Sequence, residues 1–346
     1  PASFTYQSKK TIMRKILQLV TTGVFLLSVT AVLGYNDDQG KSKSGISDKP
    51  VAQTRGANCA PANYRLTMDF NDVSCQLETG GLLFLDRANN VATYKVPKTG
   101  DATAIYAASL WIGGTDTNGQ LKLAAVKFRS DGNDFWPGPL TVNSGNGNYN
   151  PLIPQGYGAR RDYGDANVDP MVCATYDNIF TVRKAEVIAF IRWWECNNPN
   201  IYNPNFENCE GIEMPSAEVM ARILAWPGNG NTTLNQDPFL APYFDRDQDL
   251  IYDVSDGDYP WYDDILGRDE IICGTDRRTS LYGDETHWWI FNDKGNIHTE
   301  TGGQGIGMEI RAQAFSFATD DEINKMTFFN YELINRGTQT LYNTYF

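Results

Sequence analysis

The segment "THWWIFNDKGNIHTETGGQGIGMEIRAQAFSFATDDEINKMTFFNYELINRG", residues 286–337, decides the fold class. Three runs rich in aromatic and β-branched residues (286–293, 307–318 and 325–337) are separated by clusters of Gly, Asn and Asp, which is the pattern of strands joined by loops. In the third run, even-numbered residues face one way and odd-numbered residues the other, a period of two. This region therefore predicts β-strands.

The rest of the chain carries similar signals. Residues 81–96 and 108–128 each hold two apolar arms around a turn dipeptide, Asn89-Asn90 and Asn118-Gly119, and read as β-hairpins. Residues 184–194 fit a strand, or a helix on their alanine and glutamate content. Residues 215–226, with Ser216 at a cap position, are the better helix candidate, although residues 218–226 could equally form a strand. The expected fold is mainly β, with sandwich-like antiparallel sheets, long Gly/Asn/Pro-rich loops and little helix.

The N-terminal region reads as an export signal. Arg14 and Lys15 follow Met13 and precede an apolar run that ends in small residues, so residues 13–31 are predicted to be a signal peptide, cleaved after Ala31 or alternatively after Gly34. Residues 1–12 precede this natural start and are set aside as upstream read-through. The run is short and interrupted by polar residues, which disfavours a transmembrane helix.

The remaining chain divides by composition. Residues 32–58 are polar and predict a flexible lead-in. We expect a β-rich domain over 59–225 and a second β-rich region over 226–346, incomplete because the sequence stops within a strand pattern at the C-terminus.

The charge balance excludes some partners. The net charge is −13, and removal of residues 1–31 takes away four basic residues and no acidic ones, which leaves −17. Such a surface repels nucleic acid and anionic membranes. We expect no nucleic-acid partner and no integral membrane span in the mature chain.

All six cysteines lie in the mature part, and an even number in an exported chain favours disulfides. Six cysteines allow 15 pairings, so the connectivity cannot be deduced. Short loops favour Cys59–Cys75 and Cys196–Cys209, which leaves Cys173–Cys273. Free structural thiols are the alternative.

The stretch "YFDRDQDLIYDVSDGDYP" (243–260) places six aspartates in fourteen residues. Counted from the first aspartate, positions 1, 3, 5, 9 and 12 are acidic and position 7 can offer a backbone carbonyl. Oxygen ligands of this kind suit Ca²⁺ better than Mg²⁺. The predicted structural calcium ligands are Asp245, Asp247, Asp249, Ile251, Asp253 and Asp256. The alternative is a solvated acidic loop.

The spacing resembles the calcium loops of thrombospondin type 3 repeats and, more loosely, EF-hands. Leu250 departs from it, because those loops carry glycine at the sharp turn. Asp256 is also shorter than the bidentate glutamate of an EF-hand, and Pro242 and Pro260 bracket the loop.

Catalytic motifs are lacking. His287 and His298 are the only histidines and lie in none of the known nucleophile or zinc patterns, so we expect no catalytic residues. Trp136 and Trp261 sit in turn-rich loops and are candidates for ligand contact, with packing as the alternative. Adjacent tryptophans in a strand point to opposite faces, so at most one of Trp288 and Trp289 is expected in the core.

The segments "LWIGGTDTNGQLKLAA", "GNDFWPGPL", "FDRDQDLIYDVSDGDYP", "HWWIFNDKGNIHTETGG" and "FFNYELINRGTQTLYNTYF" together resemble the N-terminal regions of very large exported proteins of Bacteroidota. Those proteins typically end in a type IX secretion sorting domain or a gliding-motility-associated module. The resemblance implies secretion or display on the extracellular side of a Gram-negative outer membrane, by way of the export machinery.

The combined expectation is a non-catalytic, calcium-stabilised module of a large secreted or cell-surface protein, with an adhesin-like or scaffold role. Its partners would be glycans or other cell-surface proteins. The alternative is part of a secreted polysaccharide-binding or polysaccharide-degrading enzyme.

Overall fold

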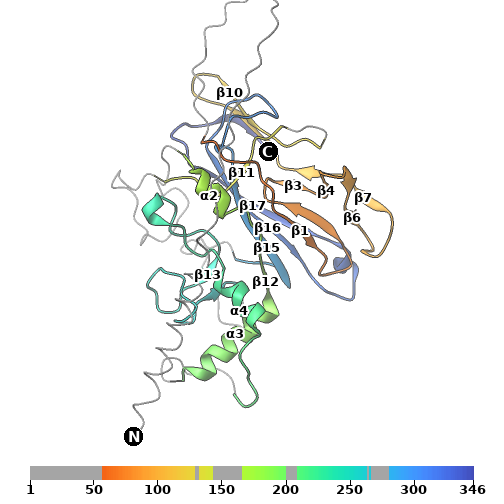
Figure 1. Ribbon diagram of the computed structural model, residues 1–346, viewed down its shortest axis with the longest axis vertical. Coiled ribbons are helices and arrows are strands. Elements are labelled where there is room, and N and C mark those ends of the chain that lie inside the picture. The colour runs from red at the N-terminus through yellow and green to blue at the C-terminus, as the bar shows by residue number, and fades with distance from the viewer. Residues whose placement is uncertain (1–56, 129–131, 143–165, 200–208, 263–264, 266–279) are drawn as a thin grey trace, which may run out of the picture. The chain divides into compact units, whose positions relative to one another are not determined.

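The computed structural model describes residues 57–128, 132–142, 166–199, 209–262, 265 and 280–346 (Figure 1). These belong to one compact unit, residues 54–346. The predicted signal peptide, its cleavage sites, almost all of the predicted lead-in and Cys273 lie outside the described residues. The described part is mainly β, as the sequence predicts.

A central antiparallel sheet organises the fold. Its longest strands are β15 (Glu285–Asn292), β16 (Met308–Ser316) and β17 (Phe328–Asn335), paired in that order. All three strands predicted from residues 286–337 are confirmed. Two short strands, β11 (Trp136–Pro137) and β12 (Phe180–Arg183), share the other edge of β15.

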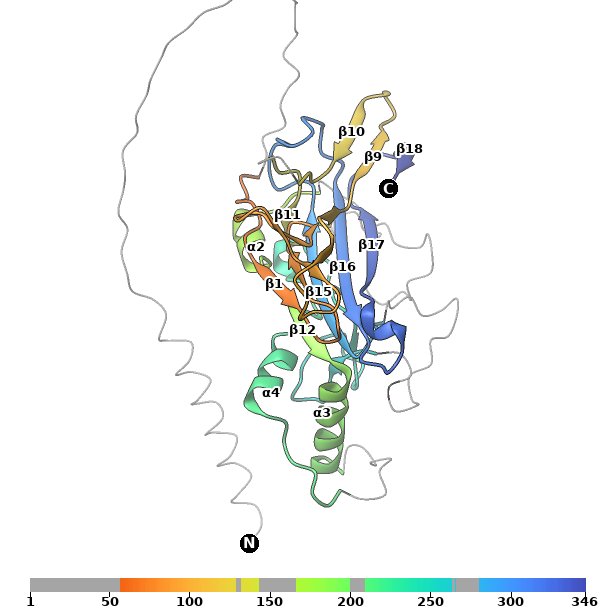
Figure 2. The same ribbon diagram turned by 90° about the vertical axis from the view of Figure 1, so that its right-hand side faces the viewer.

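One face of this sheet packs against a smaller sheet in a sandwich-like arrangement (Figure 2). The smaller sheet consists of β1 (Arg65–Met68), β2 (Cys75–Glu78), β3 (Leu82–Leu83) and β8 (Ala108–Ser109). Strand β16 shows how the sequence builds the interface, because its apolar even-numbered residues enter this core while its odd-numbered Glu309, Arg311 and Gln313 face the opposite side.

The opposite face of the central sheet is covered too. The helices α3 (Lys184–Asn197) and α4 (Ala217–Leu224) and the aromatic-rich segment 239–262 form a second core with Trp288 and Ile290. Trp288 and Trp289 are therefore both buried, and the prediction that at most one lies in the core was wrong. A strand covered on both faces buries both of its sides, as β15 does along its whole length.

Helix α3 resolves the ambiguity of residues 184–194, and the strand interpretation of that segment was wrong. Its Val187, Phe190, Ile191 and Trp194 are spaced to fall on one helical face, and all four are buried in the second core. Helix α4 is confirmed: the Ser216 side chain caps it by accepting from the Val219 N–H.

The two predicted hairpins are confirmed. Strands β4 (Leu85–Asp86) and β5 (Val91–Ala92) flank Asn89-Asn90, and β9 (Ile112–Thr115) and β10 (Leu121–Ala124) flank Asn118-Gly119. Asn90 and Gly119 have positive φ, which these turn residues tolerate. The last strand, β18 (Tyr342–Tyr345), pairs with β9.

The remaining elements are short. They are β6 (Tyr94–Lys95), β7 (Thr103–Ile105), α2 (Pro170–Thr175), β13 (Tyr243–Phe244), β14 (Tyr259–Pro260) and the 3₁₀ turns Thr232–Leu234 and Glu322–Lys325. Strands β11 and β12 lie before residue 225 and pair with β15 after it. Residues 59–225 and 226–346 thus contribute strands to one sheet within one compact unit.

The described residues contain two disulfides, and one of them matches the favoured pairing. Cys196–Cys209 is confirmed, whereas Cys59 pairs with Cys173 instead of Cys75. The predicted pairs Cys59–Cys75 and Cys173–Cys273 were wrong because sequence distance does not measure spatial distance. Cys75 points from β2 into the first core as a buried free thiol, and burial raises its pKa to about 12.

Removing the Cys59–Cys173 bridge with a Cys59→Ala/Cys173→Ala variant is expected to lower the free energy of unfolding by about 2–5 kcal/mol, since the bridge closes a loop of 114 residues. The Cys196→Ala/Cys209→Ala variant is the matched control. Its loop is 13 residues, so its loss should be about 1–2 kcal/mol smaller in the chain-entropy model. Urea denaturation of both variants measures the difference. An equal loss would contradict the loop-length argument.

Candidate metal centre

The aspartate-rich loop is closed by a two-strand ladder. In β13 and β14, Tyr243 pairs with Pro260 and Phe244 with Tyr259. Continued by one residue, this register sets Asp245 opposite Asp258. Ligand oxygens of Asp245, Asp247 and Asp258 lie within 4.8 Å of one another, close enough to share one cation.

The backbone around the cluster holds two of these carboxylates in place. Asp258 is fully buried; its Oδ1 accepts from the Arg246 N–H at 2.8 Å and its Oδ2 from the Asp253 N–H at 3.0 Å. Asp245 Oδ2 accepts from the Leu250 N–H at 2.8 Å. The other oxygen, Asp245 Oδ1, is shielded from solvent and has no hydrogen-bond donor among the described residues. A buried carboxylate oxygen without a donor is costly unless a cation binds it.

The predicted ligands divide into two groups. Asp245 and Asp247 belong to the converging cluster, while Asp249, Asp253 and Asp256 do not. Asp249 Oδ1 accepts from the Ile251 N–H, and Asp253 Oδ1 accepts from the Ser255 N–H and hydroxyl, so these carboxylates stabilise local turns. A ligand role for the Ile251 carbonyl stays a prediction.

Asp258 is the residue that sequence spacing missed. It is the sixth aspartate of the stretch but falls outside the 1-3-5-9-12 pattern. The available signal was the aromatic residues Tyr243, Phe244 and Tyr259, which lie in the two paired segments that bring the ends of the loop together.

Leu250 adopts the backbone conformation that glycine would supply. Its φ is 68° and that of Gln248 is 62°, both in the left-handed region. The Leu250 carbonyl accepts hydrogen bonds from the Tyr243 hydroxyl at 2.9 Å and from Asn229 Nδ2 at 3.1 Å. These contacts hold the sharp turn without glycine, against a backbone cost of about 1–2 kcal/mol.

Burial and neighbouring carboxylates raise the pKa of two residues of the cluster, Asp245 and Asp258. Burial, and secondarily Asp245 and Asp247, raise the pKa of Asp258 to about 6. Burial and the neighbouring Asp249 and Asp247 raise the pKa of Asp245.

The guanidinium of Arg246, the basic residue inside the loop, contacts two residues of α3. The group stacks over Trp194 at 4.7 Å and pairs with Glu195 at 3.2 Å. The side chain thus links the loop to the helix.

The donor set fits a hard divalent cation. Three carboxylates supply anionic oxygens, which Ca²⁺ accepts in flexible geometry, and water can complete its six to eight ligands. Mg²⁺ demands a near-octahedral arrangement and dehydrates reluctantly, so Ca²⁺ fits better. Because two oxygens of Asp258 already accept backbone hydrogen bonds, the cage is partial, and we expect affinity in the range of extracellular calcium modules, about 10⁻⁴–10⁻³ M.

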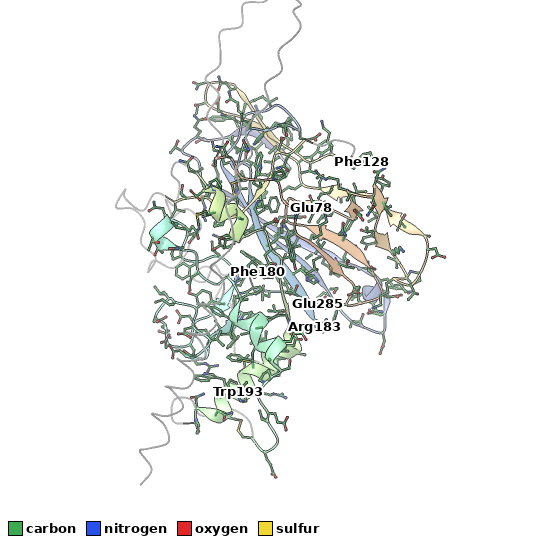
Figure 3. The ribbon with its side chains drawn as sticks, in the orientation of Figure 1. Glu78, Phe128, Phe180, Arg183, Trp193 and Glu285 are labelled. Carbon is green, nitrogen blue, oxygen red and sulfur yellow. A yellow bond between two sulfur atoms is a disulfide. The ribbon has the colours of Figure 1, made fainter. Side chains whose placement is uncertain are left out.

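His287 lies in a polar contact chain between β12 and β15. Its Nδ1 is 2.8 Å from Thr181 Oγ1 and its Nε2 is 3.1 Å from Glu285 Oε1. Arg183, adjacent to Glu285 in Figure 3, pairs with that carboxylate at 2.7 Å. Although burial raises the pKa of Glu285, His287 and secondarily Arg183 hold that pKa below its usual range. His287 is 2% exposed, and its buried contacts with Thr181 and Glu285 connect β12 to β15.

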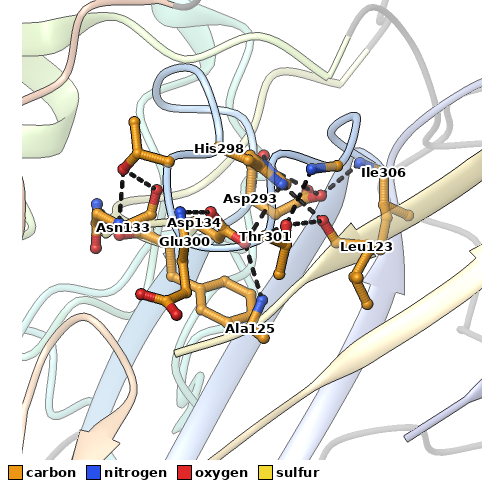
Figure 4. A network of polar contacts seen from close by, with 12 residues as sticks. Leu123, Ala125, Asn133, Asp134, Asp293, His298, Glu300, Thr301 and Ile306 are labelled. Carbon is orange, nitrogen blue, oxygen red and sulfur yellow. Dashed lines mark hydrogen bonds and ion pairs between the residues drawn. The ribbon is translucent and has the colours of Figure 1, made fainter. Parts of the chain in front are cut away.

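His298 is the centre of a second buried network, shown in Figure 4. Its Nδ1 is 2.7 Å from the Leu123 carbonyl oxygen and its Nε2 is 2.7 Å from the Asp293 carbonyl oxygen. Asp134 accepts hydrogen bonds from the Ala125 and Glu300 N–H groups. These contacts fasten the loop after β15 to the β9–β10 hairpin, and both ring nitrogens of His298 are engaged by backbone.

The two tryptophans predicted as ligand contacts are buried. Trp136 is 2% exposed and packs beside His298 and Gly295, and Trp261 is 3% exposed in the second core. The ligand-contact interpretation was wrong for both, because a ring enclosed on all sides offers no face to a ligand.

No family model, curated protein or solved structure matches this chain. Among the described residues, none of the helices combines the length and the apolar character needed to cross a bilayer.

Proposed function

We propose that this chain is a non-catalytic, calcium-stabilised module of a large secreted or cell-surface protein, with an adhesion or scaffold role. The observation that carries the proposal is the convergence of Asp245, Asp247 and Asp258 around a buried oxygen that lacks a hydrogen-bond donor. Burial, and secondarily the neighbouring carboxylates, raise the pKa of Asp258, and a cation there would offset both effects.

Two further observations support an exported protein. The described part of the chain carries the disulfides Cys59–Cys173 and Cys196–Cys209, and such bonds form and persist in oxidising compartments. The predicted signal peptide points the same way, and outside the cell Ca²⁺ is available at millimolar concentration. The resemblance to large exported Bacteroidota proteins makes the extracellular side of a Gram-negative outer membrane the proposed location.

A structural role for the histidines supports the non-catalytic assignment. The ring nitrogens of His287 contact Thr181 and Glu285, and those of His298 contact two backbone carbonyls. Both rings are almost fully buried, so neither offers a nitrogen to a substrate.

Calcium binding measured by isothermal titration calorimetry tests the proposal. We expect about one Ca²⁺ per chain at pH 7 and weaker binding of Mg²⁺. Affinity should fall as the pH is lowered from 7 to 5, because Asp258, with a pKa of about 6 in the cation-free protein, must lose its proton to bind the ion. Absence of saturable heat with Ca²⁺ at neutral pH would overturn the proposal.

The raised pKa of Asp258 also determines the direction in which stability changes with pH in the absence of calcium. The pKa of Asp258 is higher in the folded protein than its ordinary value of 3.8, so folding favours its protonated form. The contribution of this group is fully present below about pH 4 and is lost as the pH rises through 6. Added Ca²⁺ should restore stability above pH 6.

A further inference from the structure

Trp111 differs from the other tryptophans of the chain. All eight lie within the described residues, and Trp111 is 55% exposed whereas the six at 136, 194, 226, 261, 288 and 289 are at most 3% exposed. Exposed, clustered aromatic surface commonly marks an interaction site. The neighbouring Tyr106 and Phe128 are also exposed and pack edge-to-face with a centroid distance of 5.5 Å.

The indole ring is fixed in place even though it is exposed. Trp111 Nε1 donates to the Val126 carbonyl at 2.9 Å and to Ser109 Oγ at 3.1 Å, and Ser109 Oγ itself donates to the Val126 carbonyl at 2.7 Å. With its polar edge anchored, the ring presents apolar surface to solvent. A preorganised side chain loses little conformational entropy when it binds a ligand.

Trp111 forms one wall of a groove of about 240 Å³. Ala108 and Ser109 of β8 and Val126, Lys127 and Phe128 contribute to its lining. Figure 3 labels Phe128 near the periphery of the described structure. The combination of aromatic surface with a few polar groups is typical of small-ligand sites.

Charge restricts the ligand. Lys127 Nζ lies 2.9 Å from Glu300 Oε1, so the cation at the groove is already paired with a buried carboxylate. The protein as a whole carries a large negative charge, which repels anionic polymers. A neutral ligand with an apolar face and peripheral hydroxyl groups matches the groove, and this is the chemistry of a pyranose ring.

We propose that the Trp111 groove binds a sugar ring of a neutral oligosaccharide. The C–H face of the ring stacks on the Trp111 indole, and sugar hydroxyls reach Ser109 Oγ and Lys127 Nζ. The site lies on other elements than the aspartate cluster. This proposal goes beyond calcium stabilisation. It rests on the proposed function in one respect, because it names a ligand for the adhesion role.

The test is titration calorimetry of the chain with five neutral hexasaccharides: cellohexaose, laminarihexaose, mannohexaose, xylohexaose and maltohexaose. We expect saturable binding of at least one, with a Kd of about 0.1–10 mM, and blue-shifted tryptophan fluorescence on binding. An oligogalacturonate of the same length should bind more weakly. Each titration is run with Ca²⁺ and again with EDTA, so that failure of sugar binding and failure of calcium binding are seen separately.

Trp111→Ala should weaken binding of that hexasaccharide at least about tenfold. Trp111→Phe, which keeps a smaller aromatic face, should lose less. Tyr345→Ala is the matched control, because Tyr345 is 74% exposed on β18 and does not line the groove. Circular dichroism verifies that each variant is folded. No saturable binding of any of the five sugars, or unchanged binding by folded Trp111→Ala, overturns the proposal.

Discussion

Replacing Arg336 with methionine is expected to lower the free energy of unfolding by about 3–5 kcal/mol. Arg336 is fully buried, and its Nη2 lies 2.8 Å from both Asp237 Oδ2 and Glu309 Oε1. Arg311 contacts the same two oxygens at 3.1 and 3.0 Å, so among the described residues two guanidinium groups face two buried carboxylates. Loss of one guanidinium leaves an uncompensated charge in the interior, which is the costly case.

The network joins three parts of the fold. Asp237 lies in the loop after α4, Glu309 and Arg311 lie on β16, and Arg336 directly follows β17. The positive charge of the two arginines holds the pKa of Glu309 below its usual range even though burial raises it. The network therefore fixes the loop before the aspartate cluster to the central sheet.

Arg183→Met is the matched control for Arg336→Met. The Arg183 side chain is 47% exposed, and its ion pair with Glu285 should contribute only about 0–1 kcal/mol. Adding Asp237→Asn to Arg336→Met restores charge balance and should recover part of the loss, since asparagine keeps the oxygen that accepts from the Phe239 N–H. Urea denaturation measures all three variants. If Arg336→Met lowered the free energy of unfolding by no more than Arg183→Met does, the account of the network would be contradicted.

Calcium is expected to raise the melting temperature of chelated protein by about 3–10 °C at 10 mM. With the expected affinity this concentration is about 10–100 Kd, and binding then stabilises the folded state by about 1.4–2.7 kcal/mol. For a chain of this size, each kcal/mol corresponds to a shift of about 2–4 °C. The physical cause is relief of repulsion among Asp245, Asp247 and Asp258, whose oxygens converge within the described part of the chain.

The sequence predicted those parts of the fold that rest on local patterns. The period of two over 325–337, the Asn118-Gly119 turn and the Ser216 cap each act within a few residues, and the structure confirms the strand, the hairpin and the helix. Strands β11 and β12 were missed because two to four residues carry too short a pattern. Their pairing depends on β15, more than a hundred residues away in the chain.

The candidate metal site was predicted only in part, because it too depends on pairing between segments that lie apart in the sequence. The concentration of aspartates is visible in the sequence, but which of them converge depends on the ladder between Tyr243–Phe244 and Tyr259–Pro260. That ladder places Asp258 in the cluster. The carboxylates of Asp249 and Asp253 instead accept hydrogen bonds from nearby backbone N–H groups. The roles of Trp111, Trp136 and Trp261 likewise depend on burial, which the loop composition around them did not reveal.

The most direct test of the central claim is the calcium-dependent melting shift of wild type, Asp245→Asn and Asp249→Asn. Asp245→Asn keeps the oxygen that accepts from the Leu250 N–H and replaces the unpartnered Oδ1, so it should abolish the shift with little loss of stability in EDTA. Asp249→Asn changes a carboxylate outside the cluster and should retain most of the shift. A wild-type protein that Ca²⁺ does not stabilise, or an Asp245→Asn protein that it stabilises as much as wild type, would contradict the account.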